Sequence, residues 1–445
     1  MQTDGHSGTL GWLLAGLAFS LCLGAMVGLD SLGGLAIRPY LPLLVLAAII
    51  IAARAARRGY LPPVSAKGSL PALGVLLVAA LLSIFNAEYV GEAVKQAVFL
   101  TGMAGIYASL LLAELDDRDL WRMTLAIIWS LLAAVGFGFV QFAREYASSG
   151  SVVSAFVQFH SFFQERNEFG LFMVYAVGFL IPLALNDEAP FRYKVLLILT
   201  GLTLLLNFSR GSLLAVAGML VLDRLGSGHL FASRRAGRSL LILAGLAFAA
   251  AASVLVLVPA LAGLPEFLDV LTTRAVGFRP SGDETTSIRL LFIQTAARAF
   301  MAHPLIGSGI GNVGFVLNHF GRGADYGRVT LHGAVQPPQY DLGTTSNLLA
   351  DLLLEIGLLG LLSFLVFLGA VARASITRAR GQGRMGLVHA GALLSLAGLL
   401  INGLSYNSLY LPFTWVALAL APLAAGRLRS AATAAPRPAA PVPVA

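Results

Sequence analysis

Residues 193–225 read YKVLLILTGLTLLLNFSRGSLLAVAGMLVLDRL, two apolar runs that are separated by Ser209-Arg210-Gly211. The runs, at 193–208 and 212–225, are apolar enough to predict membrane spans. Each is shorter than the ~20 residues that a straight crossing helix needs, so these spans are expected to be tilted or broken. The sequence therefore predicts an arginine at the point where one short span ends and the next begins.

Apolar stretches of this kind recur along the whole chain of 445 residues, which is 57% hydrophobic and only 12% charged. A soluble protein carries about 25% charged residues, so this composition predicts an integral membrane protein. We predict an all-α polytopic fold of about twelve transmembrane helices. The expected spans are 10–29, 36–53, 70–86, 96–113, 120–143, 169–186, 193–208, 212–225, 239–262, 347–372, 385–404 and 408–426.

One long polar stretch interrupts the series of spans. It divides the chain into transmembrane helices one to nine at 1–262, a loop with short helices at 263–346, and helices ten to twelve at 347–430. Residues 431–445 are rich in Ala and Pro and are expected to form a disordered tail. A polytopic protein with one large segment outside the lipid usually acts there or at the lipid boundary.

Basic residues predict the orientation in the membrane. Most of the 30 Lys and Arg residues lie in connections on the same side as the termini. The short connections on the other side hold only Arg38, Lys95, Arg144, Arg166 and Arg210. Both termini are therefore expected to be cytoplasmic and the long loop to face outward. The net charge of +8 serves this orientation, and no nucleic-acid partner is expected.

The chain offers little for redox or metal chemistry. The single cysteine, Cys22, lies inside the first span, which excludes a disulfide within one chain. No HExxH-type spacing or cluster of acids is present, so neither a metal nor another cofactor is expected. The first residues contain no Lys or Arg before the apolar stretch, which argues against a cleavable signal peptide.

Arg210 departs from the positive-inside pattern and needs an explanation. The span that follows it starts at the outer face, where backbone N–H groups and the positive end of the helix dipole point outward. The small neighbours Ser209 and Gly211 let an oxyanion approach, and a guanidinium at a helix N-terminus is a strong phosphate site. The plainer interpretation is an arginine that anchors the span at the lipid boundary, but this connection is too tight to need an anchor.

Two other outward arginines are candidates for the same site. Arg289 lies in the first turn of an amphipathic helix that ends at His303-Pro304, and a bound anion would explain a cation at that helix start. Arg166 stands between Glu165 and Glu168 at the start of the sixth span, where it can also pair with either acid. The glycine-rich sequence at 307–312 is predicted to form a tight turn at the membrane surface.

A histidine at the outer face could activate an acceptor hydroxyl as a general base. The outward candidates are His160, His303, His319 and His332. His303 precedes a proline at a helix end, whereas His332 lies in the most polar part of the loop and is our choice. Glu355, within the tenth span, is either a further functional residue or the partner of a boundary arginine.

These motifs resemble the O-antigen ligase and Wzy-type polysaccharide polymerase superfamily of bacterial inner-membrane proteins. The resemblance runs from roughly Asn167 to Gly360. It rests on the order and spacing of five pieces: Asn167, Ser209-Arg210-Gly211, Ser287-Ile288-Arg289, His303-Pro304-Leu305-Ile306-Gly307-Ser308-Gly309, and Asn347 through Glu355-Ile356-Gly357-Leu358-Leu359-Gly360.

The resemblance implies transfer of a glycan from a polyprenyl diphosphate carrier, such as undecaprenyl diphosphate, to a sugar hydroxyl at the periplasmic face without a metal. Arginines that match Arg210 and Arg289 would hold the diphosphate, and a histidine would activate the acceptor. The family usually places that histidine before Asn347, but Ser346 stands here, and a serine is no base near neutral pH. His332 is the nearest substitute, and Ser209, Gly211, Arg166, Asn167, Ser346 and Asn347 are expected to support the site.

Four functions remain open. We favour an O-antigen ligase that attaches the glycan to the lipid A-core in lipopolysaccharide biosynthesis, over a polymerase that joins repeat units, because the single long loop and the Ser-Arg-Gly pattern suit a ligase. A transporter or flippase would carry polar residues deep in several spans or an internal repeat of spans. A non-catalytic assembly protein is the remaining alternative, and Ser346 favours it.

Overall fold

The structure is a computed structural model that describes most of the chain. The described residues are 7–23, 29–32, 35–37, 40–58, 68–151, 154–155, 159–163, 166–186, 189–207, 209–226, 294–320, 347–376 and 383–434. Within these ranges the chain is helical, as its composition predicted, apart from turns and one short antiparallel hairpin of β1 (Leu29–Leu32) and β2 (Leu35–Ile37).

The helices follow the predicted spans closely. A helix lies at the position of every predicted span except 239–262, which is outside the described residues. They are α1 (Ser7–Ser20), α2 (Tyr40–Arg58), α3 (Ser69–Ser83), α4 (Val90–Leu112), α5 (Asp117–Ser149), α7 (Arg166–Leu185), α8 (Phe191–Asn207), α9 (Arg210–Gly226), α15 (Leu348–Ser375), α16 (Arg384–Gly403) and α17 (Pro412–Ala434), with the short α13 (Val313–Phe320) in the loop.

Six of the helices in the described ranges are each long and apolar enough to cross a membrane on their own. They are α4, α5, α7, α15, α16 and α3 together with the short helix η2 (Ile84–Asn86) that continues it. The total of about twelve spans stays a prediction, because α1, α8 and α9 are shorter and because α2 and α17 are not among the six. These short helices nevertheless pack within the same bundle.

Several boundaries differ from the predicted ones. The first span was expected to reach residue 29, but α1 and the short helix η1 (Leu21–Leu23) end earlier and β1 begins at Leu29. The pair Gly33-Gly34 between two apolar runs is a turn signal that favours a hairpin over a helix there. At the other end, α17 continues to Ala434, past the predicted start of the tail at Ala431, because alanine is the strongest helix former.

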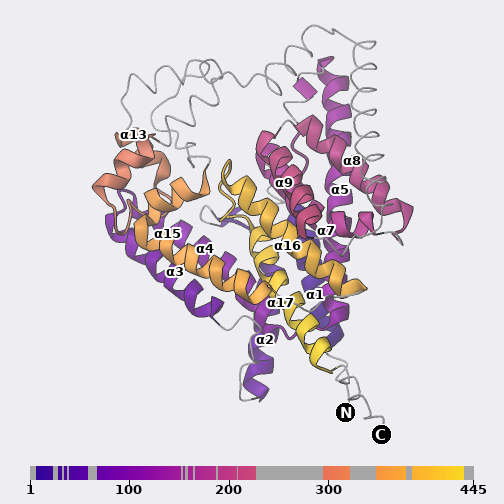
Figure 1. Ribbon diagram of the computed structural model, residues 1–445. Coiled ribbons are helices and arrows are strands. Elements are labelled where there is room, and N and C mark those ends of the chain that lie inside the picture. Colours follow the sequence, from indigo (N-terminus) through magenta and orange to yellow (C-terminus); the bar gives the residue numbers. More distant parts are fainter. Residues whose placement is uncertain are drawn as a thin grey trace.

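The bundle is built around α16 and α17, which lie in its middle in Figure 1. On one side α5, α7 and α9 pack on α16, with α8 against α7. On the other side α3 packs on α15 and α4 packs on α17. α1 packs on α5 and α2, so the first helices close the bundle near one end.

The centre of the first group is α7, whose residues from Phe169 to Leu185 are all buried. A helix that is apolar on every face must be surrounded by other helices. Small residues let α16 approach it closely, since a Cβ added at Gly178 would collide with Ser395 and one at Gly391 would meet Phe179 at 2.9 Å. This is the close packing expected where lipid provides no hydrophobic drive for helix association.

The second group contains a break in α15. Gly357 has φ 70° and ψ −164°, a combination that is essentially restricted to glycine, so the helix is interrupted there. The interruption frees backbone groups in a buried setting, where each needs a partner. Four backbone hydrogen bonds to the segment 304–309 supply them: Ser308 N to Leu354 O (2.8 Å), Gly309 N to Glu355 O (3.0 Å), Leu358 N to Pro304 O (2.9 Å) and Leu359 N to Leu305 O (3.0 Å).

The partner segment overlaps the glycine-rich sequence at 307–312, which forms the predicted tight turn. Its place at the membrane surface stays a prediction. Gly307, Gly309 and Gly311 all have positive φ, at 72°, 98° and 75°. Residues 307–310 are buried between α15 and the α3–α4 connection. The Asn86 side chain donates a hydrogen bond to Gly307 O at 2.9 Å, which ties the turn to the second of these surfaces.

We predict that Gly357→Ala lowers the midpoint of thermal unfolding of the purified protein. A side chain here is strained by about 1–3 kcal/mol, and its Cβ would also meet the Leu305 carbonyl at 2.6 Å. Gly369→Ala is the control, because it lies on the same helix with nothing within 4 Å of the added Cβ. Equal midpoints for the two variants would show that the break is not under this constraint.

Candidate functional site

Buried polar side chains form a chain of hydrogen bonds between the start of α9 and the end of α16. Asn402 Nδ2 donates to Ser212 Oγ at 3.0 Å, and Ser212 Oγ donates to Ser209 Oγ at 2.9 Å. Ser212 and Asn402 are fully buried, and Ser209 is nearly so. In a membrane protein such groups need internal partners, so this chain fixes how the two helix ends meet.

The same cluster reaches the start of α7 and the end of α8. Asn207 Nδ2 donates to the Arg166 carbonyl at 2.9 Å, and Ser209 Oγ donates to Asn167 Oδ1 at 3.5 Å. Asn207 is 1% exposed, and its Oδ1 has no hydrogen-bond donor among the described residues. The cluster therefore contains a buried acceptor that a ligand hydroxyl could use.

Glycines allow this close approach of helix ends. A Cβ at Gly211 would collide with Ser405, just beyond the end of α16. A Cβ at Gly170 in α7 would meet Ser212 Oγ at 2.5 Å. The Gly after Arg210 is thus explained by packing against the 403–405 segment, in addition to any access it gives to an anion.

Arg210 is the first residue of α9, and it is exposed. The first intrahelical bond of α9 runs from Leu213 N to Ser209 O at 3.0 Å, so the N–H groups before Leu213 have no acceptor within the helix. The guanidinium thus shares this end of α9 with the positive end of the helix dipole. The hydroxyl and amide cluster begins at Ser209, the residue before Arg210.

Asn347 joins the start of α15 to the same region. Its Oδ1 accepts from the backbone N–H groups of Leu349 and Ala350, and it thereby caps the helix. Its Nδ2 donates to the carbonyl of Leu404 at 3.1 Å, next to Ser405. The starts of α7, α9 and α15 and the end of α16 therefore meet at one end of the bundle.

A second polar network lies inside α15. Glu355 is 3% exposed, and its carboxyl group accepts from Gly311 N at 3.0 Å and from the Tyr410 hydroxyl at 2.7 Å. One turn before it, Asp351 accepts from Asn407 Nδ2 at 2.8 Å. One of the two predictions for Glu355 was that it pairs with an arginine at the membrane boundary. Among the described residues its partners are instead two neutral donors. The network ties the glycine-rich turn and the start of α17 to α15.

Residues 195–365 match the O-antigen ligase family. The matched segment begins in α8, includes α9 and ends in α15, so it contains both Arg210 and the buried acids of α15. The match confirms the resemblance to the O-antigen ligase and Wzy-type polymerase superfamily. No curated protein matches the chain.

The predicted site residues divide into those that the structure describes and those that it does not. It brings six of them together: Arg166 and Asn167, which precede the matched segment, and Ser209, Arg210, Gly211 and Asn347, which lie within it. Arg289, His332 and Ser346 fall inside the match but outside the described residues. Their roles stay predictions.

Besides His332, three histidines were predicted to face outward; His319 lies in α13, and the structure describes the surroundings of the other two. His160 Nε2 lies 3.2 Å from the Gln141 amide, and its buried Nδ1 has no partner among the described residues. His303 is exposed directly after the helix at 294–302, where the predicted amphipathic helix was expected to end. Within the described ranges, no three His, Cys, Asp or Glu side chains gather so as to hold a metal ion.

Sequence reasoning missed several polar residues of these two hydrogen-bond networks. They are Asn207, Ser212, Asp351, Asn402, Ser405, Asn407 and Tyr410. A usable signal was present, since a polar residue near the end of an apolar span needs a partner. The partners themselves come from distant spans and could not be assigned from one sequence.

We predict a steric coupling between Gly211 and Ser405. Gly211→Ala should destabilise the protein by about 1–3 kcal/mol, because the added methyl group overpacks the junction of α9 and α16. In a Ser405→Gly background the same change should have little effect, which a double-mutant cycle of thermal midpoints measures. Gly201→Ala, on α8 with nothing within 4 Å, is the control. An additive cycle would contradict the proposed contact.

Proposed function

We propose that this protein is a membrane glycosyltransferase that moves a glycan from a polyprenyl diphosphate carrier to a sugar hydroxyl. The reaction would take place at the periplasmic face of a bacterial inner membrane, without a metal. The O-antigen ligase match supports an enzyme of the ligase and polymerase type in a membrane. The donor, the acceptor and the face are the further content of the proposal.

The observation that carries the proposal is the position of Arg210 at the start of α9, next in sequence to the cluster of Ser209, Ser212 and Asn402. A diphosphate is recognised by a guanidinium and by backbone N–H groups at a helix N-terminus. As the glycan leaves the carrier, negative charge grows on the departing diphosphate. Donors fixed in advance at that point would lower the barrier.

The orientation rests on charge. We call Arg210 with Ser209, Ser212 and Asn402 the Arg210 cluster. Most arginines of the described helices lie at the opposite end of the bundle. Examples are Arg57 at the end of α2, Arg192 at the start of α8 and Arg373 near the end of α15. The positive-inside rule assigns that opposite end to the cytoplasm. The end with Arg210 and Asn347 is then periplasmic, where lipid-linked glycans would be joined.

The remaining roles belong to residues outside the described ranges. Arg289 would supply a second guanidinium to the diphosphate. His332 would take the proton of the acceptor hydroxyl, because Ser346 stands at the position of the family histidine and cannot act as a base. Asn207, whose buried Oδ1 has no hydrogen-bond donor among the described residues, would orient a sugar hydroxyl beside the carrier.

The two activities of the superfamily differ in the acceptor of the glycan. We favour ligation of O-antigen to the lipid A-core, since one long outward loop and the Ser209-Arg210-Gly211 motif suit a ligase. Polymerisation of surface polysaccharide repeat units is the alternative and uses the same donor.

The test is complementation of a strain that lacks the gene, with glycan profiling. Arg210→Ala should lower transfer at least ~10²-fold, because it removes a donor to the leaving group. Arg210→Lys should retain part of the activity, since an ammonium keeps the charge but not the forked geometry. The control is Arg144→Ala, which should be active. Arg144 is an exposed arginine near the C-terminal end of α5.

The same profiles separate the two acceptors. In the Arg210→Ala strain, long chains that stay on the carrier and are missing from the lipid A-core indicate a ligase. Surface glycan with single repeats indicates a polymerase. Near-normal transfer by Arg210→Ala, in protein present at wild-type level, would refute the diphosphate assignment.

A further inference from the structure

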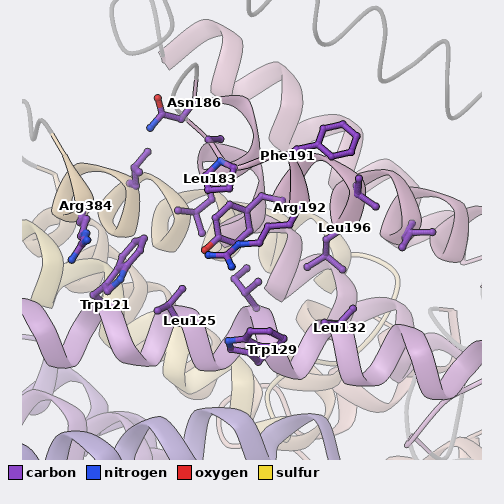
Figure 2. Close-up of a pocket in the computed structure, with 17 residues that line it drawn as sticks. Trp121, Leu125, Trp129, Leu132, Leu183, Asn186, Phe191, Arg192, Leu196 and Arg384 are labelled. Atoms are coloured by element: carbon purple, nitrogen blue, oxygen red, sulfur yellow. The ribbon is translucent and has the colours of Figure 1, made fainter.

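A groove lies at the opposite end of the bundle from the Arg210 cluster. It is bounded by α5, the end of α7 and the starts of α8 and α16, and its volume is about 880 Å³. Figure 2 shows Trp121, Leu125, Trp129 and Leu132 along one wall and Phe191, Arg192 and Leu196 along the other. α8 alone spans 17 residues, or about 25 Å, so the groove is separate from the proposed glycan site.

The walls of the groove are apolar and open to the side of the bundle. Trp129 is 57% exposed and Phe191 is 77% exposed, and Leu132 and Leu199 are exposed beside them. In a membrane-spanning bundle, side chains of this kind face hydrocarbon. Trp121 and Trp129 also belong to the residue type that is enriched where helices leave the lipid.

The mouth of the groove is basic. Arg192 is in the first turn of α8, and Arg384 is the first residue of α16. The guanidinium of Arg384 lies over the Trp121 ring at 5.4 Å from its centroid, and that of Arg192 lies over the Tyr193 ring at 5.3 Å. Such stacking orients a guanidinium while its N–H donors at the plane's edge stay able to bind an oxyanion.

Nothing in the described ranges neutralises these two cations. The ion pairs there join Glu92 with Lys95, Asp119 with Arg122 and Asp117 with Arg427, and none includes Arg192 or Arg384. Asp187 and Glu188, the acids nearest to Arg192 along the chain, lie outside those ranges. The groove mouth also receives two helix N-termini, and that of α16 has Gly383 as its N-cap with no side-chain cap.

We propose that this groove binds an anionic glycerophospholipid of the cytoplasmic leaflet. Its phosphate lies between Arg192 and Arg384, and an acyl chain lies between Trp129 and Leu132 on one wall and Leu199 on the other. A basic pocket between transmembrane helices at the cytoplasmic side is a typical site for an anionic lipid head group. The inference rests on the proposed orientation of the bundle and is independent of the proposed glycan transfer.

The head-group contact is tested by native mass spectrometry of the purified full-length protein with added dioleoyl phosphatidylglycerol or dioleoyl phosphatidylethanolamine. The wild-type protein should bind the anionic phosphatidylglycerol about tenfold more tightly than the zwitterionic phosphatidylethanolamine. Arg192→Gln/Arg384→Gln should weaken that binding roughly 10- to 30-fold and leave the zwitterionic lipid unchanged. Arg57→Gln/Arg373→Gln removes the same charge from exposed positions at the same end of the bundle, and it should bind as wild type.

The acyl-chain contact has its own matched pair on α8. Leu199 lines the groove and is 36% exposed, whereas Leu205 is 38% exposed and does not line it. Leu199→Trp should fill the groove and reduce binding of phosphatidylglycerol at least about fivefold, and Leu205→Trp should not. Each residue is at the surface of its helix, so the folded protein should accept the larger side chain.

The leaflet is tested with Phe191→Cys, at the mouth of the groove, because the native Cys22 is buried. A membrane-impermeant maleimide should label this variant in inside-out vesicles and not in right-side-out ones. The proposal is overturned if the labelling is reversed, if the two lipids bind equally, or if the Arg57/Arg373 control loses binding as the Arg192/Arg384 variant does. None of these readouts depends on glycan transfer.

Discussion

Backbone groups buried in a membrane must find partners within the protein, and the break of α15 at Gly357 meets this constraint through a distant segment. The peptide groups on both sides of the break form four hydrogen bonds with residues 304–309. Only glycine adopts the required conformation at Gly357, and positive φ at Gly307 lets the turn approach. The loop segment 294–312 is thereby held on the bundle rather than left outside it.

Other features of the site depend on this attachment. Once Gly311 is fixed beside α15, its N–H can satisfy the buried Glu355, and Tyr410 brings the start of α17 to the same carboxyl group. Asn347 then links α15 to Leu404, at the end of α16, where Asn402 begins the chain of hydrogen bonds to Ser212 and Ser209. The proposed diphosphate site and the loop are thus parts of one connected polar framework.

The sequence predicted what depends on local composition. Apolar length placed the helices, and the tight turn at 307–312 followed from its glycines. The hairpin at 29–37 and the break at Gly357 were not predicted, because the break depends on hydrogen bonds to a segment some 50 residues earlier. At the site, Arg210 and Asn347 stood out by charge and position, whereas Asn207 and Asn402 matter only through neighbours on other helices. For Arg289, His332 and Ser346, the expectation still rests on sequence alone.

The central claim is that the start of α9 binds a diphosphate, and the dissociation constant for undecaprenyl diphosphate tests it most directly. The measurement compares purified wild type, Arg210→Gln and Arg144→Gln in the same detergent. A charge-assisted hydrogen bond contributes about 1.5–3 kcal/mol, so Arg210→Gln should bind the carrier at least about tenfold more weakly. Arg144→Gln should bind as wild type. Equal dissociation constants for all three proteins would contradict the account.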